Sequence, residues 1–281
     1  GEEVHAPTFP HVNHYLVLNA GEDLQNYGDN TRQLVQAVRA RNGLGFIAHP
    51  YEHSGAFANE PEIEWTAWDV KGYTGIEIWN YMSEFKSYIN SLPRALFYAL
   101  FPRLAITGPY RETLAKWDEL LGTSRVVAIG GSDAHAGTYR AGPLSRQVFS
   151  YAHLFQSVNT HVLLPASWSN DASADARMLY EALGNGRAFV AYDGLAPARG
   201  FRFTAEYKDS VYTMGNEIVT RGTGTVQFLV QTPVHARLRL LQNGFCIAEA
   251  RGKELVYSSR TPGVYRAEAY RSYAFKERGW I

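Results

Sequence analysis

The sequence predicts an α/β protein followed by a small antiparallel β-sandwich, and two patterns carry this prediction. Over residues 1–197, short apolar runs alternate with helical stretches, an order typical of βαβ units in a parallel barrel or a doubly wound sheet. Over residues 198–281, short runs alternate apolar and polar residues and are separated by turn signals such as Gln242-Asn243-Gly244. We therefore predict a domain boundary near residue 197.

The elements of the first part follow from apolar patterning and from terminator residues. Buried strands are expected over 14–20, 45–50, 74–80, 125–135, 160–165 and 187–194. Helices are expected over 31–41, around 92–104 and over 171–183. The first helix places Leu34, Val35 and Val38 on one face and stops at Asn42-Gly43, a pair that terminates helices well. After residue 198 the pattern predicts only short strands, with TVQFLVQT and ARLRLLQNG as two separate ones.

Composition and charge exclude several classes of protein. Of the 281 residues, 46% are apolar and 14% aromatic, which is enough to build a core and excludes a disordered polyampholyte. Lys and Arg together number 27, as do Asp and Glu, so we expect no nucleic acid or anionic membrane held by bulk charge. The single cysteine, Cys246, excludes an intrachain disulfide and a Cys-built zinc site, and we expect it to be a small buried hydrophobic residue.

Two targeting signals are missing from the sequence. No apolar run reaches the roughly 18 residues of a membrane span, so no span is expected. The opening residues, Gly1 to His5, have neither the basic start nor the apolar stretch of a signal peptide. The sequence therefore leaves both the cellular location and the oligomeric state open.

Ionisable side chains stand where three of the expected strands end. His49 lies at the exit of 45–50, Asn80 ends 74–80 with Glu77 inside that run, and Asp133 and His135 lie two residues apart after Gly130-Gly131. In parallel α/β barrels the carboxyl ends of the strands share one mouth, where ligands and catalytic groups sit. Imidazoles and carboxylates together form the ligand set of Zn, Mn or Fe sites. The convergence of these strands on one mouth therefore favours a metal site.

Two further candidates lie near the amino terminus, and each residue also has a structural interpretation. Glu3 and His14 flank a turn that contains two prolines. A strand-end His is often a hydrogen-bonded structural residue, and Asp-x-His after glycines also forms a turn with an Asx hydrogen bond. Glu77, inside the apolar run 74–80, could pair with a buried Arg.

Four segments resemble a known family. GSDAH at 131–135, AHP at 48–50, GIEIWN at 75–80 and the opening GEEVHAPTFPHVNHYLVL resemble the PHP (polymerase and histidinol phosphatase) superfamily. The EIWN form of the middle motif and the PGVYRAEAY segment are most similar to the CehA/McbA-type metallohydrolases. The resemblance covers essentially the whole chain, and GSDAH with a preceding AHP is its most specific part.

The resemblance implies a distorted (βα)7 barrel with two or three divalent ions (Zn, Mn or Fe) at its carboxyl mouth. It implies hydrolysis by a water that these ions activate. It also implies five metal ligands, with Glu3 as the bridging carboxylate: Glu3, His14, His49, Asp133 and His135. The H-x-H strand with which the family begins does not occur in this sequence, so we expect the chain to be a piece of a longer protein that lacks the first barrel strands.

The expected function is a metal-dependent hydrolase acting on a small-molecule phosphoester or related ester. Carboxylic or carbamate ester hydrolysis is the alternative within enzymes, and a non-catalytic binding or scaffold protein with a relic site is the alternative outside them. No catalytic side chain is assigned; Tyr51 and His53, on the loop after 45–50, are weak candidates. Arg140 and Asn80 are candidates for binding substrate, Arg140 because its planar guanidinium suits an anionic group.

Overall fold

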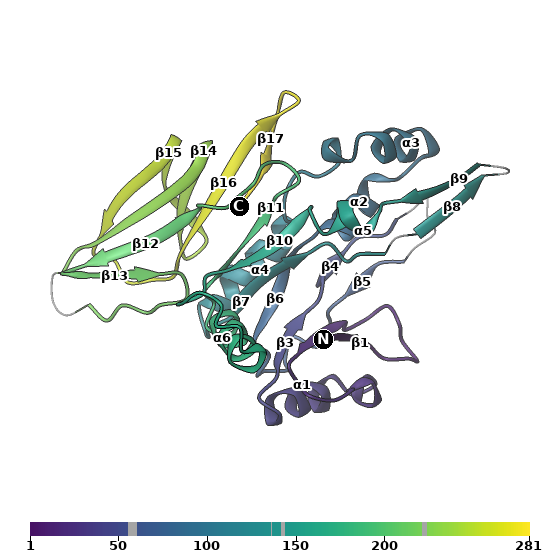
Figure 1. Cartoon of the computed structure of the whole chain (residues 1–281), viewed down its shortest axis with the longest axis horizontal. Helices are drawn as coiled ribbons and strands as arrows, with labels where there is room; N and C mark the ends of the chain where they lie inside the picture. Colours follow the sequence, from purple (N-terminus) through teal and green to yellow (C-terminus); the bar gives the residue numbers. More distant parts are fainter. Residues whose placement is uncertain (56–60, 136, 142–143, 221–223) are drawn as a thin grey trace.

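The computed structural model describes residues 1–55, 61–135, 137–141, 144–220 and 224–281, with the backbone alone described over 137–141 and 144–148. These residues form a mixed α/β fold with six α-helices and several β-sheets, as the sequence predicts (Figure 1). The central sheet has the strand order β1-β2-β3-β6-β7 and consists of β1 (Glu2–Val4), β2 (Tyr15–Leu18), β3 (Leu44–Ile47), β6 (Gly75–Asn80) and β7 (Val127–Gly131).

The strand directions differ from the all-parallel pattern that the sequence suggested. Only β3, β6 and β7 run parallel, whereas β1, β2 and β3 pair antiparallel. A separate antiparallel pair, β10 (Val158–Val162) and β11 (Ala188–Tyr192), stands beside β7 (Figure 1). The Thr160 hydroxyl joins this pair to β7, since it accepts from the Gly130 N–H (2.9 Å) and donates to the Gly130 carbonyl (2.7 Å). No strand ladder closes the sheet into a barrel within the described residues.

Three helices, at 31–40, 92–100 and 172–184, match the expected positions, whereas those at 81–88, 111–121 and 151–154 were not expected. Helix α1 (Thr31–Ala40) is capped by the Asn30 side chain, which accepts from the Gln33 N–H, and it buries Leu34, Val35 and Val38 as predicted. No helix among the described residues combines the length and apolarity needed to cross a bilayer. The remaining helices are α2 (Tyr81–Tyr88), α3 (Leu92–Leu100), α4 (Arg111–Leu121), α5 (Tyr151–Leu154) and α6 (Ala172–Gly184), with 3-10 turns η1 (Gln25–Tyr27) and η2 (Pro102–Leu104).

Two small hairpins lie outside the main sheets. They are formed by β4 (Tyr51–Glu52) with β5 (Ile63–Glu64), and by β8 (Gly137–Ala141) with β9 (Leu144–Val148). The second hairpin follows β7 and projects from the body of the molecule as an arm (Figure 1). Both hairpins therefore extend from the strand ends at which the sequence places its candidate metal ligands.

The last part of the chain forms one bent six-stranded antiparallel sheet. Its strands are β12 (Arg202–Tyr207), β13 (Ser210–Thr213), β14 (Val226–Gln242), β15 (Phe245–Ser259), β16 (Tyr265–Tyr273) and β17 (Lys276–Gly279). TVQFLVQT and ARLRLLQNG, expected as separate strands, are continuous in β14, with a register shift between Gln231 and Ala236. The two halves of β14 pair with β12 and with β16. The sheet packs around a core to which β11 also contributes Phe189 and Ala191, and this gives the part a sandwich-like form.

The hairpin between β14 and β15 confirms one prediction and corrects another. Asn243 (φ 50°) and Gly244 (φ 83°) occupy the left-handed region, as a two-residue type I′ turn requires. Cys246 lies directly after this turn and is exposed, so the expectation of a buried cysteine is wrong. The reason is that β15 runs along the edge of the sheet, where one face of the strand is open to solvent.

The C-terminal segment packs back onto the first part of the chain. The fully buried Trp280 donates from its indole N–H to the Ala196 carbonyl (2.7 Å), and its own carbonyl accepts from the Tyr192 N–H (2.8 Å). Arg266 of β16 forms a two-pronged ion pair with Asp118 of α4 (2.7 and 2.8 Å). The bent sheet is therefore tied to β11 and α4 at several points.

Asp193, at the end of β11, gives the fold a measurable pH dependence. Burial opposes its ionisation, but hydrogen bonds from His161 (2.8 Å), the Ala198 N–H (2.9 Å) and Asn159 (3.1 Å) outweigh burial and hold the pKa of this carboxyl below its ordinary value. The stabilisation is therefore present above the pKa of the unfolded chain, about 4, and is lost as the pH falls below it. Urea unfolding measures the free energy of unfolding above and below this pH. On acidification it should fall less in Asp193→Asn than in the parent or in Asp209→Asn, a control at an exposed position. An equal fall in all three proteins would contradict the role of Asp193.

Candidate metal centre

Three of the predicted ligands converge at the edge formed by β1, β2 and β3. Glu3 lies in β1, His14 directly precedes β2, and His49 follows β3 with a positive φ of 22°. The same carboxylate oxygen, Glu3 Oε1, lies 2.5 Å from His14 Nδ1 and 3.3 Å from His49 Nε2. The three ligand atoms lie within 4.8 Å of one another. Residues that are 46 positions apart in the sequence are thus brought to one point.

The orientation of His14 shows that this point suits a cation. The other ring nitrogen, Nε2, lies 2.9 Å from the Pro10 carbonyl and can only donate to it. A neutral His14 therefore turns the lone pair of Nδ1 toward the Glu3 carboxylate, so that two acceptors face each other. The two groups must therefore share a proton or bind the same cation. The backbone carbonyl that orients the ring is the kind of partner that metal-bound histidines have in proteins.

A second group of ligands shares His49. Glu52 of β4 and Asp133, which follows β7 with φ 47°, each bring a carboxylate oxygen within 4.8 Å of a His49 nitrogen and of each other. His49 Nδ1 lies 3.6 Å from Glu52 Oε2, and it is buried with no hydrogen-bond partner. A neutral imidazole offers one lone pair, so His49 completes one group at a time. The group with Glu3 and His14 is the one in which two imidazoles meet a carboxylate.

The electrostatics of the cluster match this geometry. Burial opposes ionisation of the Glu3 carboxyl, but hydrogen bonds and charge from His14 and His49 outweigh it and hold its pKa well below the usual range. Burial also disfavours the charged form of His49, yet the Glu3 hydrogen bond and the nearby carboxylates of Glu77, Glu52 and Asp133 raise its pKa to about 9. The carboxylates thus create a strongly negative potential at the position of the ring.

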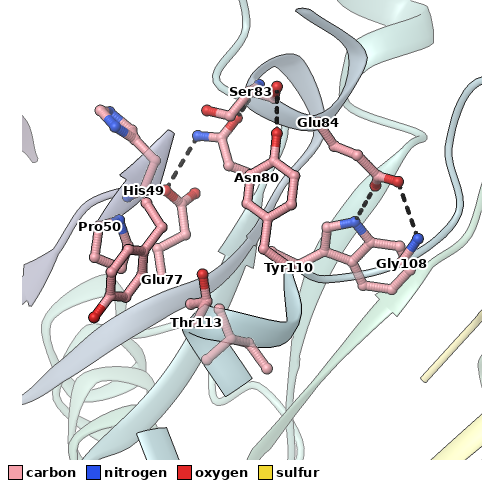
Figure 2. A pocket seen from close by; sticks show the side chains of 12 residues that line it. His49, Pro50, Glu77, Asn80, Ser83, Glu84, Gly108, Tyr110 and Thr113 are labelled. Atoms are coloured by element: carbon pink, nitrogen blue, oxygen red, sulfur yellow. Dashed lines mark hydrogen bonds between the residues drawn. The ribbon is translucent and has the colours of Figure 1, made fainter. Parts of the chain in front are cut away.

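Glu77 and Asn80 of β6 position the backbone of His49 through buried hydrogen bonds. Burial raises the pKa of the Glu77 carboxyl to about 7, although the nearby His49 opposes the shift. Its Oε2 accepts from the His49 backbone N–H (2.9 Å) and from the Asn80 amide (3.1 Å), and Figure 2 shows the carboxylate between these two residues. The Asn80 side-chain oxygen accepts from the Ser83 N–H (2.9 Å) and caps α2. Asn80, predicted to contact substrate, thus uses both polar atoms inside the protein.

Among the described residues, the cluster is accessible to solvent on one side. The space beside Glu77 in Figure 2 measures only about 10 Å³, room for about one water molecule. On the other side of the cluster, the side chains of Glu3 (31%), Asp133 (19%) and His135 (77%) are accessible to solvent. A ligand therefore reaches the cluster from the side of β1 and the segment that follows β7.

The other predicted site residues lie around this opening or away from it. His135 Nδ1 lies 3.0 Å from the Asp133 backbone carbonyl and 3.2 Å from the Asp133 carboxylate. His135 belongs to neither ligand group. Tyr51 stacks on Trp68, and His53 is exposed and pairs with Glu112 (2.7 Å). Arg140 is part of β8, but its side chain lies outside the described residues.

Sequence reasoning missed Glu52 as a candidate ligand and treated Glu77 as a partner for an arginine. Glu52 follows a turn and looks like an ordinary loop residue, yet it is only 6% exposed and bonds Ser83 and Lys86 of α2. One sequence signal could have indicated Glu52. It lies three residues after His49 with Pro50 between them, and a turn at this proline can bring the two side chains together. Glu77 contacts His49 and Asn80 rather than an arginine.

Comparison of the chain with protein-family models, curated proteins and solved structures returns no match. The resemblance to PHP metallohydrolases therefore stays an expectation from the sequence motifs. What the structure itself defines is an α/β protein with an imidazole–carboxylate cluster, positioned to hold a metal ion, at the carboxyl ends of β3 and β7.

Proposed function

We propose that this chain is a divalent-metal-dependent hydrolase of the PHP type, acting on a phosphoester or a related ester. The observation that carries the proposal is the convergence of Glu3, His14 and His49 on one point. Two imidazole nitrogens and a carboxylate oxygen are a ligand set that Zn, Mn and Fe accept. His49 Nδ1 is buried without a hydrogen-bond partner, so the ring is held through the contact of its Nε2 with Glu3.

The residues of the chain have separable roles in such a reaction. Divalent ions, when bound, lower the pKa of a coordinated water toward about 7 and neutralise charge on the attacked group. Glu3, His14 and His49 would hold one ion, and Glu52 and Asp133 supply carboxylate oxygens next to it. Glu77 positions the His49 backbone, and Asn80 positions Glu77. Within the described part of the chain, the exposed edges of Glu3 and Asp133 leave room for substrate.

A metal-dependent substrate screen tests the proposal. The chain is stripped with EDTA, reloaded with Mn²⁺, Zn²⁺ or Fe²⁺, and assayed on p-nitrophenyl phosphate, bis(p-nitrophenyl) phosphate, p-nitrophenyl acetate and an aryl carbamate. We expect phosphoester hydrolysis that is lost on stripping and restored on reloading. Turnover of the carboxylic or carbamate esters alone would favour the alternative ester chemistry. Stoichiometric metal binding without any turnover would make the chain a binding protein.

A further inference from the structure

A large cavity lies between the α/β part and the bent sheet. Its volume is about 830 Å³, within the range of roughly 300–1,000 Å³ that small-molecule sites occupy. Six of the residues that define its two walls are Ile78 of β6, Leu114 and Trp117 of α4, Phe203 of β12, Phe228 of β14 and Tyr265 of β16. The space opens to solvent, so a small molecule can enter it from outside.

The cavity is separate from the metal cluster. Its lining contains none of the residues of the two ligand groups, which are Glu3, His14, His49, Glu52 and Asp133. A ligand in the cavity therefore shares no side chain with a metal ion at Glu3.

Contacts around the rim join the two walls at their edges and so fix the distance between them. On one side, Arg266 of β16 forms its two-pronged ion pair with Asp118 of α4. The Gly279 N–H of β17 donates to the Thr107 carbonyl (2.7 Å), which joins the end of the sheet to the segment before α4. On the opposite side the turn after α6 touches the segment after β13 so closely that a Cβ on Gly215 would lie 2.1 Å from the Asn185 carbonyl oxygen. The cavity is thus preformed and does not depend on a ligand to open it.

The walls select for a flat apolar molecule. The rings of Phe228 and Tyr265 stack at 4.1 Å with an interplanar angle of 23°, and Phe203 lies against Phe228 at 6.2 Å, so one wall is an aromatic surface. Trp117 belongs to the facing wall, and the Arg266 guanidinium lies 5.8 Å from its ring centroid. The charged side chains of the lining are already engaged within the protein: Arg266 with Asp118 and Glu268, Arg125 with Glu217, and Arg260 with the Thr225 hydroxyl.

We propose that this cavity binds a planar, uncharged aromatic small molecule, at a site distinct from the metal cluster. Aromatic rings gain from offset stacking beyond the burial of their area, and the cavity supplies rings on both sides. The proposal does not depend on the hydrolase activity, because none of the six wall residues belongs to the ligand groups.

The test uses N-phenyl-1-naphthylamine, a neutral aromatic probe whose fluorescence rises in apolar surroundings. We expect one saturable site per chain, with equal affinity in EDTA and in Mn²⁺. Val226→Trp, which fills the cavity, should weaken binding about tenfold or more. Val256→Trp, the same change at a half-exposed position of β15 outside the lining, should leave it unchanged.

A second measurement serves if Val226→Trp fails to fold. Energy transfer from tryptophan to the bound probe should fall in Trp117→Phe, because Trp117 lines the cavity, and should persist in Trp168→Phe, because that residue is exposed elsewhere. Absence of a saturable site in the parent, transfer that is equal in both tryptophan variants, or displacement of the probe by Mn²⁺ would each overturn the proposal. Loss of hydrolysis with intact probe binding would refute the proposed function alone.

Discussion

His49→Ala is expected to release the bound metal and to lower hydrolysis by about 100-fold or more. Substitutions of the partners that merely orient metal ligands already cost roughly 10–100-fold, and His49 is placed to be a ligand itself. Its ring belongs to both ligand groups, so its removal leaves Glu3 facing only His14 and leaves Glu52 facing only Asp133. The backbone N–H of residue 49, which donates to Glu77, is retained. Metal content by elemental analysis and the rate at saturating substrate measure the two effects.

A matched variant shows whether the effect is local. His235→Ala removes an exposed imidazole from β14, in the bent sheet, and should change neither metal content nor rate. Circular dichroism and thermal unfolding of both variants establish that the fold is kept. Retention of a full complement of metal by folded His49→Ala would contradict the assignment of the cluster.

Glu84→Ala is expected to lower the free energy of unfolding by about 4 kcal/mol, the largest stability effect that we predict. The Glu84 carboxyl is 2% exposed and accepts hydrogen bonds from the Trp79 indole (2.8 Å), the Gly108 N–H (3.0 Å) and both the N–H and the hydroxyl of Thr107. Burial raises its pKa, and these donors oppose the shift. Truncation leaves several buried donors without an acceptor, each of which costs about 1–3 kcal/mol.

Urea unfolding at neutral pH, with a control, checks this prediction. Glu119→Ala removes a carboxylate that is 67% exposed and pairs with Lys116 on the surface of α4. Surface pairs of this kind contribute at most about 1 kcal/mol, so the control should change little. Glu84→Gln keeps one acceptor but turns an amide N–H₂ toward the other donors, and it should fall between the two. Equal stability of Glu84→Ala and Glu119→Ala would contradict this account.

The fold was predictable where a single segment carries its own signal. Helix α1 follows from the spacing of its apolar residues and from Asn42-Gly43, and the β14–β15 turn follows from Asn243-Gly244. Strand direction was not predictable, because the pattern of buried residues is the same in either orientation. The break expected between two strands became a register shift near Pro233, because a proline in a strand can be accommodated at a bulge.

The candidate site was predictable in part for a similar reason. Motif positions identified Glu3, His14 and His49, and the structure brings these three together. Glu52 could not be found, because a polar residue after a turn gives no local sign that tertiary packing will bury it. His135 lies beside Asp133 but outside both groups, and its position depends on a loop whose path the local sequence does not determine.

The most direct test of the metal centre is anomalous diffraction from crystals of the chain loaded with Mn²⁺. We predict an anomalous peak within coordination distance of Glu3 Oε1, His14 Nδ1 and His49 Nε2. A peak bound by other residues, or no peak at this cluster at saturating Mn²⁺, would contradict it.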